Sequence, residues 1–76
     1  MQIDLLDTFL DLAETRSFHR TAERLRITQS TVSARVTALE QAVGSRLFDR
    51  SRAGTDLTPG GKRFEPHARA LRHEWN

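Results

Sequence analysis

A run of small polar side chains starts at Thr28, and its residue types suit recognition of nucleic-acid bases. The amide of Gln29 offers a donor and an acceptor, which match N6 and N7 of adenine, and the guanidinium of Arg35 suits a guanine edge or a phosphate. A solvated surface helix would normally carry Glu and Lys in such a run. The alternative interpretation is a helix cap followed by an ordinary polar surface. The candidate DNA-binding residues in this run are Thr28, Gln29, Ser30, Thr31, Ser33 and Arg35.

Basic residues gather again around a turn signal at positions 51–54. Arg52 suits a contact along the DNA backbone or in a narrow minor groove. Arg50 has two interpretations, either a DNA contact or an ion pair with Glu40 that would hold the turn to the preceding helix. His19 can touch a phosphate, although plain exposure explains it equally well. The further DNA-binding candidates are Ser17, His19, Arg20, Arg50 and Arg52.

The charge of the 76-residue chain is unevenly distributed, although the net charge is only +2. Positions 1–15 carry four acids and no base, a charge of −4, whereas the remainder carries twelve bases against six acids, a charge of +6. Eleven of the twelve bases are arginine, whose rigid fork of donors suits phosphates. This pattern favours a surface that meets an anion, although genome composition alone can also enrich arginine.

Composition excludes several classes of protein. The chain has no cysteine, so neither a disulfide nor a thiolate metal site can stabilise it. No apolar run approaches the roughly 20 residues of a membrane span, and no signal peptide precedes the first helix, so we expect a cytoplasmic protein with no membrane contact. His67 and His73 are too far apart along a helix to share a metal in the usual manner. We therefore expect no enzyme, no metal and no cofactor.

Apolar spacing predicts four helices and one hairpin. A chain of this length buries only about 60% of its unfolded surface, so a second subunit or a bound partner is expected to stabilise it. Ser17, Thr28 and Thr58 suit helix N-caps, and Gly44 suits a helix C-cap. Pro66 predicts a kink near residues 62–66. The helices are expected over residues 3–14, 18–25, 29–43 and 59–75, and the hairpin is expected to pair runs 47–50 and 55–58 across a four-residue turn at 51–54.

The two middle helices form a candidate helix-turn-helix. Ala22 is small where two helices must cross closely, and Leu25, Ile27 and Val32 are apolar where the helices and their turn would share a core. Arg26 departs from the generic pattern, which often has glycine at this position.

A set of short motifs extends along the chain in a characteristic order and spacing. These are Ser17-Phe18, Ala22-Glu23-Arg24-Leu25, Thr28-Gln29-Ser30-Thr31-Val32-Ser33, Leu39-Glu40, Gly44, Leu47-Phe48-Asp49-Arg50 and Leu57-Thr58-Pro59-Gly60-Gly61. With these motifs the chain resembles the N-terminal domain of LysR-type transcriptional regulators over essentially its whole length. The resemblance implies a mainly α, winged helix-turn-helix with a three-helix core and a small β-hairpin wing in residues 1–58, with residues 29–43 as the recognition helix. It implies a long linker helix over residues 59–76.

The resemblance also implies a homodimer that forms through the linker helix, with the first helix packed on the partner's linker. The expected ligand is double-stranded DNA with an interrupted inverted repeat, bound in the cytoplasm on the nucleoid. Ser30-Thr31 and Ala34 depart from the family, which often has Pro-Ala and Arg there, so the base preference is expected to be unusual. The expected dimerisation residues are Leu5, Phe9, Leu12, Phe64, Leu71 and Trp75.

Family members carry a longer C-terminal effector-binding domain, so any small-molecule inducer is expected to bind outside these residues. The competing hypothesis is a helical protein-interaction or dimerisation module, in which the apolar first and last helices bind a partner and the basic hairpin has no role in DNA binding.

Overall fold

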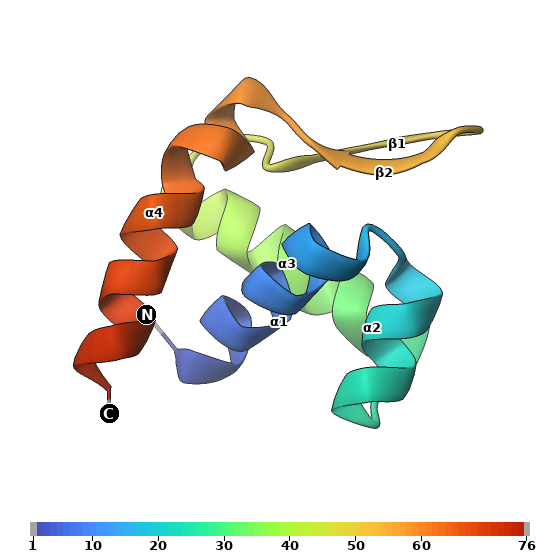
Figure 1. Cartoon of the computed structure of the whole chain (residues 1–76), viewed down its shortest axis with the longest axis horizontal. Coiled ribbons are helices and arrows are strands. Elements are labelled where there is room, and N and C mark those ends of the chain that lie inside the picture. Colours follow the sequence, from blue (N-terminus) through green and yellow to red (C-terminus); the bar gives the residue numbers. More distant parts are fainter. Residues whose placement is uncertain (1, 76) are drawn as a thin grey trace.

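Four helices and one β-hairpin follow one another along residues 2–75, the residues that the computed structural model describes (Figure 1). This arrangement confirms the mainly α, winged helix-turn-helix fold expected from the sequence. The elements are α1 (Ile3–Thr15), α2 (Phe18–Leu25), α3 (Gln29–Val43), β1 (Phe48–Ser51), β2 (Gly54–Leu57) and α4 (Pro59–Glu74).

Local hydrogen bonds start and end the helices where the sequence predicts. The hydroxyls of Ser17, Thr28 and Thr58 each accept a hydrogen bond from the backbone N–H three residues further along, which satisfies one free donor of each helix start. Gly44 ends α3 in the left-handed conformation, with φ of 79°. Helix α4 includes Pro66, and whether the helix bends there remains a prediction.

Helix α1 forms the centre of the molecule, because it packs against α2, α3 and α4 (Figure 1). The fully buried ring of Phe9 contacts the ring of Phe48 in the hairpin, with centroids 5.4 Å apart, and the ring of Phe64 in α4, with centroids 5.2 Å apart. One aromatic cluster therefore joins α1, the hairpin and α4. The buried apolar residues are Leu6, Phe9, Leu12, Phe18, Ala22, Val32, Val36, Leu39, Leu47, Phe48, Phe64 and Ala68.

This burial corrects half of the predicted dimer contacts. Phe9 and Leu12 are 0% exposed and Phe64 is 8% exposed within a single chain, so none of them offers a surface to a partner. The apolar stripe of α4 packs against α1 of the same chain, where the ring of Phe64 contacts the ring of Phe9. Leu5 and Leu71 are half-buried, whereas Trp75 is 61% exposed.

The strands of the hairpin lie one residue closer to the turn than the sequence predicts, and the turn is shorter. Ser51 pairs with Gly54 across the antiparallel strands, so the turn contains Arg52 and Ala53 rather than residues 51–54. Gly54 permits this start of β2 because it adopts φ of 128°, which a larger residue rarely does.

The end of α4 that follows the hairpin lies close against the chain before β1. A Cβ atom on Gly61 would lie 2.2 Å from the carbonyl oxygen of Leu47, and only glycine allows this approach. The same carbonyl accepts a hydrogen bond from the backbone N–H of Thr58. The glycines at the start of α4 therefore bring the two ends of the wing together.

Arg26 makes the turn between α2 and α3 with a backbone conformation that favours glycine. Its φ and ψ are 57° and 47°, and its N–H bonds to the carbonyls that end α2. The next N–H, that of Ile27, donates to the carbonyl of Ala22 at 3.0 Å. Because an L-residue is strained in this conformation, the arginine is held there by the surrounding turn.

We predict that Arg26→Gly is more stable than Arg26→Ala. Both variants lose the same charge, but glycine relieves the left-handed strain, which should be worth about 1 kcal/mol after its greater entropy in the unfolded chain is subtracted. Thermal unfolding should therefore show a melting temperature roughly 4–8 °C higher for the glycine variant. Equal melting temperatures would contradict a left-handed residue 26.

Candidate nucleic-acid interface

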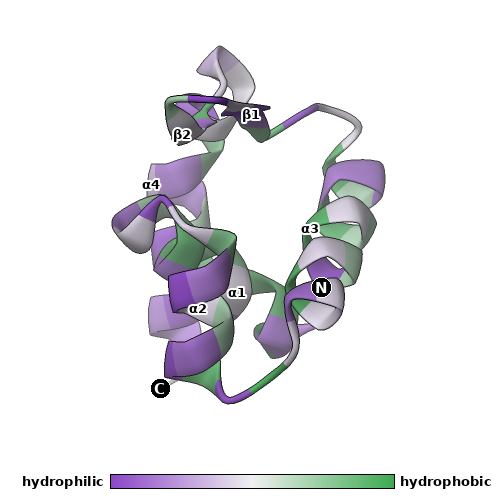
Figure 2. Cartoon of the chain, turned by 90° about the vertical axis from the view of Figure 1, so that its right-hand side faces the viewer, coloured by the Kyte–Doolittle hydropathy of each residue, from purple (hydrophilic) through white to green (hydrophobic). Residues whose placement is uncertain are grey.

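The exposed face of α3 is small and uncharged. Helix α3 lies along one side of the molecule (Figure 2), with Val32, Val36 and Leu39 buried beneath it. A face of this kind permits close approach to a large ligand, since no long side chain holds it away. The exposed residues along it are Ser30, Ala34, Thr37, Ala38 and Gln41.

The start of α3 adjoins the start of α2 through polar side chains. The Nε2 of Gln29 lies 3.4 Å from the Nδ1 of His19, and the Nε2 of His19 lies 3.4 Å from a carboxylate oxygen of Glu23. Both Gln29 and His19 are exposed. The structure therefore brings two of the predicted site residues together, beside the capping hydroxyl of Ser17.

Arg35 lies on a different side of α3 from these residues. Its guanidinium is half-buried and donates to the Oγ1 of Thr8 in α1 at 3.4 Å. Thr8 is fully buried and donates to the carbonyl of Asp4. The side chain therefore joins α3 to α1, and the contact of Arg35 with a guanine edge or a phosphate stays a prediction.

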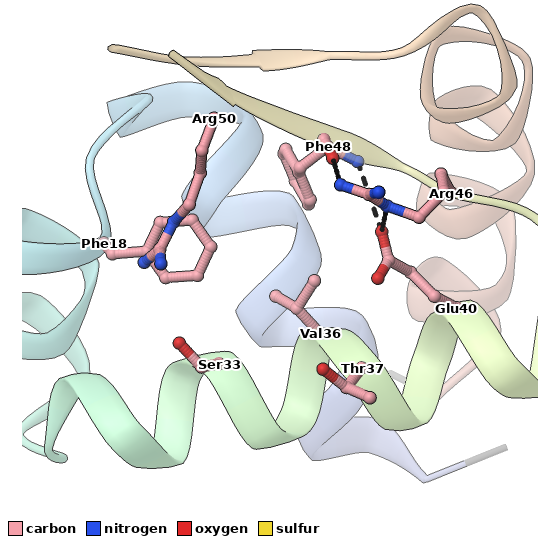
Figure 3. Close-up of a pocket in the computed structure, with 8 residues that line it drawn as sticks. All are labelled: Phe18, Ser33, Val36, Thr37, Glu40, Arg46, Phe48 and Arg50. Atoms are coloured by element: carbon pink, nitrogen blue, oxygen red, sulfur yellow. Dashed lines mark hydrogen bonds and ion pairs between the residues drawn. The ribbon is translucent and has the colours of Figure 1, made fainter. Parts of the chain in front are cut away.

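Of the two interpretations of Arg50, the ion pair with Glu40 does not form. Glu40 accepts hydrogen bonds from the backbone N–H groups of Leu47 at 2.8 Å and Phe48 at 3.4 Å, and it pairs with Arg46 (Figure 3). Arg50 instead places its guanidinium over the ring of Phe18, 3.5 Å from the centroid. Glu40 does hold the hairpin to α3, but it does so through the backbone and Arg46.

A hollow of about 180 Å³ separates α3 from the first strand of the wing (Figure 3). Ser33 and Thr37 extend into it from α3, opposite Arg50. Its walls thus combine two hydroxyls with the unpaired Arg50, while the Glu40 carboxylate in the wall is paired with Arg46, so the free charge suits an anionic ligand. The lining residues are Phe18, Ser33, Val36, Thr37, Glu40, Arg46, Phe48 and Arg50.

Ion pairs neutralise the arginines unevenly. Five arginines pair with carboxylates, namely Arg16, Arg24, Arg46, Arg69 and Arg72. Within residues 2–75, four arginines of α2, its following turn and the wing form no ion pair, namely Arg20, Arg26, Arg50 and Arg52. Positive charge is therefore left unneutralised on the elements that flank the start of α3, and also at Arg35 in α3 and at Lys62 and Arg63 in α4.

Arg24 also belongs to α2, but its charge is neutralised by an ion pair. Its Nε donates to Asp11 of α1 at 2.8 Å, and this hydrogen bond, together with the charges of Asp11 and Glu14, raises the pKa of the guanidinium.

The sequence did not indicate Phe18 and Arg46 as contributors to the site, because the roles of both depend on contacts between distant elements. Phe18 carries only the signal of a buried apolar residue.

No helix within the described residues is long and apolar enough to cross a membrane. The same residues hold no group of three or more histidine, cysteine or acidic side chains placed to bind a metal ion.

Comparisons with known proteins place this geometry in context. Residues 3–62 match the family described as bacterial regulatory helix-turn-helix protein, lysR family. The HTH-type transcriptional regulator HdfR of Yersinia pestis (strain Pestoides F) is 47% identical over 75 residues, which cover 99% of this chain and 26% of that protein. The chain therefore spans about a quarter of the length of this relative.

Solved structures are similar over nearly the whole chain. VV2_1132, a LysR family transcriptional regulator, superposes with a TM-score of 0.93 at 36% identity, covering 97% of this chain and 25% of that one. DarR of Vibrio fischeri, solved in complex with DNA, superposes with a TM-score of 0.92 at 38% identity. The match covers 97% of this chain and 25% of DarR. The CbnR DNA-binding domain, solved in complex with DNA, superposes with a TM-score of 0.87 at 32% identity. The match covers 93% of this chain and 82% of that domain.

We predict that Glu40→Ala loosens the wing and destabilises the domain by about 2 kcal/mol, because two backbone N–H groups lose a charged acceptor. Urea unfolding measures this loss. Glu23→Ala is the matched control, since its exposed carboxylate contacts only the exposed His19, and it should change stability by less than about 0.5 kcal/mol. Equal losses in the two variants would show that the wing does not depend on the Glu40 carboxylate.

Proposed function

The chain belongs to the LysR family of bacterial helix-turn-helix regulators, and we propose that it is the part of such a regulator that binds specific sites on double-stranded DNA. DNA complexes of DarR and of the CbnR DNA-binding domain, both similar in fold to this chain, support the proposal. In this role the domain recognises DNA without catalysis and without a cofactor. A whole regulator of this kind acts in the cytoplasm, in contact with the nucleoid.

The observation that carries the proposal is the surface formed by α3 and its surroundings. A major groove admits a helix whose exposed face is small, and the exposed face of α3 has no charged side chain. Phosphates on either side of a groove require cations, and the elements that flank the start of α3 carry four arginines without ion pairs, namely Arg20, Arg26, Arg50 and Arg52. Both requirements of a DNA-binding surface are therefore met on one side of the domain.

The proposed roles divide between bases and phosphates. Gln29 is exposed at the start of α3 and has the amide geometry for adenine, and the neighbouring hydroxyls lie within the same turns. The α2 and wing residues suit phosphate contacts, which position the domain without specifying sequence. The base-contacting set is Gln29, Ser30, Ser33 and Thr37, with Thr28 and Thr31 at the helix start, and the phosphate-contacting set is Ser17, His19, Arg20, Arg50 and Arg52.

Dimerisation belongs to the proposal as well. Residues 1–58 would contact DNA, and residues 59–76 would form a linker helix that pairs with that of a second subunit. The exposed indole of Trp75, with half-buried Leu71 in the preceding turn, supports this pairing. Two subunits would present their α3 helices to an interrupted inverted repeat. Any inducer would bind the region that the longer relatives contain beyond these residues.

We predict that Gln29→Ala relaxes base preference, whereas Arg52→Ala weakens binding on every sequence. Loss of the amide should remove about 1–3 kcal/mol of discrimination at one base position. Loss of the wing-tip guanidinium should lower affinity uniformly and reduce the salt slope by about one. Affinities for a selected and a random duplex at several salt concentrations measure both effects.

The two variants serve as controls for each other. If Gln29→Ala loses affinity equally on selected and random duplexes, Gln29 does not contact a base. If neither variant alters binding, DNA recognition by this surface is contradicted and the alternative of a helical protein-interaction module gains support.

We also predict that Trp75→Ser weakens self-association, because it removes the large exposed apolar side chain of the linker helix. Sedimentation equilibrium should show at least a tenfold higher dissociation constant, equivalent to about 1.4 kcal/mol. Ala70→Ser, an exposed substitution earlier in α4, is the matched control and should leave the constant unchanged. Unchanged self-association in the tryptophan variant would exclude Trp75 from the dimer contact.

A further inference from the structure

Arg50 and Phe18 meet where α2, α3 and the wing converge. Arg50 extends from β1 toward α2 and places its guanidinium over the Phe18 ring, 3.5 Å from the centroid (Figure 3). Phe18 is the first residue of α2 and is 9% exposed, so the core holds the ring in place. An exposed surface side chain is therefore positioned by a buried aromatic ring.

Stacking of this kind leaves the guanidinium able to bind a phosphate. The five N–H donors of arginine lie in the plane of the group, whereas the contact with an aromatic ring uses its face. The attraction to the ring also retains the positive charge. Phe18 therefore orients Arg50 without occupying its donors, unlike a carboxylate partner, which would occupy the donors and cancel the charge.

The nearby carboxylates are directed away from Arg50 by another arginine. Arg46 pairs with Glu40, at 3.5 Å, and with Asp49, at 3.9 Å, and its Nη2 donates to the carbonyl of Phe48. Glu40 also accepts hydrogen bonds from the backbone N–H groups of Leu47 and Phe48, where the wing begins. Within residues 2–75, Arg50 itself forms no ion pair, because its acidic neighbours are already engaged.

The stacked pair lies beside the proposed recognition helix. Phe18 and Arg50 line the hollow toward Ser33 and Thr37, and they also line a second, shallower hollow of about 460 Å³ toward Gln29 and Ser17. The guanidinium thus lies between the start of α3 and the wing. If α3 enters the major groove, the strand that borders the groove must pass this point.

We propose that Phe18 is a positioning residue for DNA binding, which holds the guanidinium of Arg50 as a pre-oriented contact to a backbone phosphate. Arg46 contributes by engaging the carboxylates that would otherwise neutralise it. This inference rests on the proposed DNA binding and adds to it a residue that contacts no DNA itself.

A double-mutant cycle tests the inference on random duplex DNA, with Phe18→Leu, Arg50→Ala and their combination. Arg50→Ala should lower affinity about tenfold, since a charged hydrogen bond is lost. Phe18→Leu should lower it several-fold, and the combination should be no weaker than Arg50→Ala alone. In the control cycle, Phe18→Leu with Arg52→Ala, the fold losses should multiply, because the wing-tip arginine has no ring partner.

Two further measurements separate positioning from a general effect on the fold. In the free protein, the NMR resonance of the Arg50 Nε–H should show an upfield ring-current shift that Phe18→Leu abolishes. Phe18→Tyr retains the aromatic face and should retain both the shift and the affinity. Where Phe18→Leu fails to fold, Phe18→Met replaces it in both cycles, because its flexible side chain adapts to an irregular apolar site.

The outcomes distinguish this inference from the function on which it rests. If the unmodified chain binds DNA but the Phe18 and Arg50 losses multiply as they do in the control cycle, positioning by Phe18 is contradicted and DNA binding stands. The same holds if Phe18→Tyr loses as much affinity as Phe18→Leu. If the unmodified chain binds no duplex at low salt, the proposed function fails, and the inference fails with it.

Discussion

The contact of the Phe9 ring with two other rings determines how the elements of this domain are arranged. Phe9 is completely buried in α1, and it contacts Phe48 at the start of the wing and Phe64 in α4. Because α1 also packs on α2 and α3, a single helix fixes the helix-turn-helix, the wing and the linker relative to one another. The wing is too short to be stable alone, so its position depends on this cluster and on Glu40.

Ion pairs between these elements determine which arginines keep an unneutralised charge. Acidic residues of α1 engage arginines from α2 and α4, as in the pairs of Asp11 with Arg24 and of Asp7 with Arg72. Glu40 and Asp49 engage Arg46 at the base of the wing. The arginines that remain unpaired on α2 and the wing therefore give the proposed DNA-binding side its positive charge, although the net charge of the whole chain is only +2.

The parts of the structure that local interactions determine are the parts that the sequence predicts. The caps at Ser17, Thr28 and Thr58 and the left-handed Gly44 depend on neighbouring backbone groups, and each was predictable from residue type. The contact of Arg35 with Thr8 was not predictable from residue type, because the two side chains come close only when α1 packs on α3.

Long-range packing also accounts for the other differences. A helical stripe shows that Phe64 is apolar, but it does not show whether α1 of the same chain or a second subunit covers it. The sequence allows an ion pair between Arg50 and Glu40. Only the folded chain reveals that the Glu40 carboxylate already pairs with Arg46 and accepts hydrogen bonds from two backbone N–H groups. The tight turn at Arg52 likewise depends on the conformation of Gly54.

Selection of binding sites from an unbiased pool of duplexes, at two salt concentrations, tests the central claim most directly. The account predicts enrichment of an interrupted inverted repeat. With three unpaired arginines per chain in the phosphate-contacting set, Arg20, Arg50 and Arg52, it also predicts an affinity loss of roughly 40-fold per subunit between about 50 and 200 mM salt. An unenriched pool, or an affinity that hardly changes with salt, would contradict it.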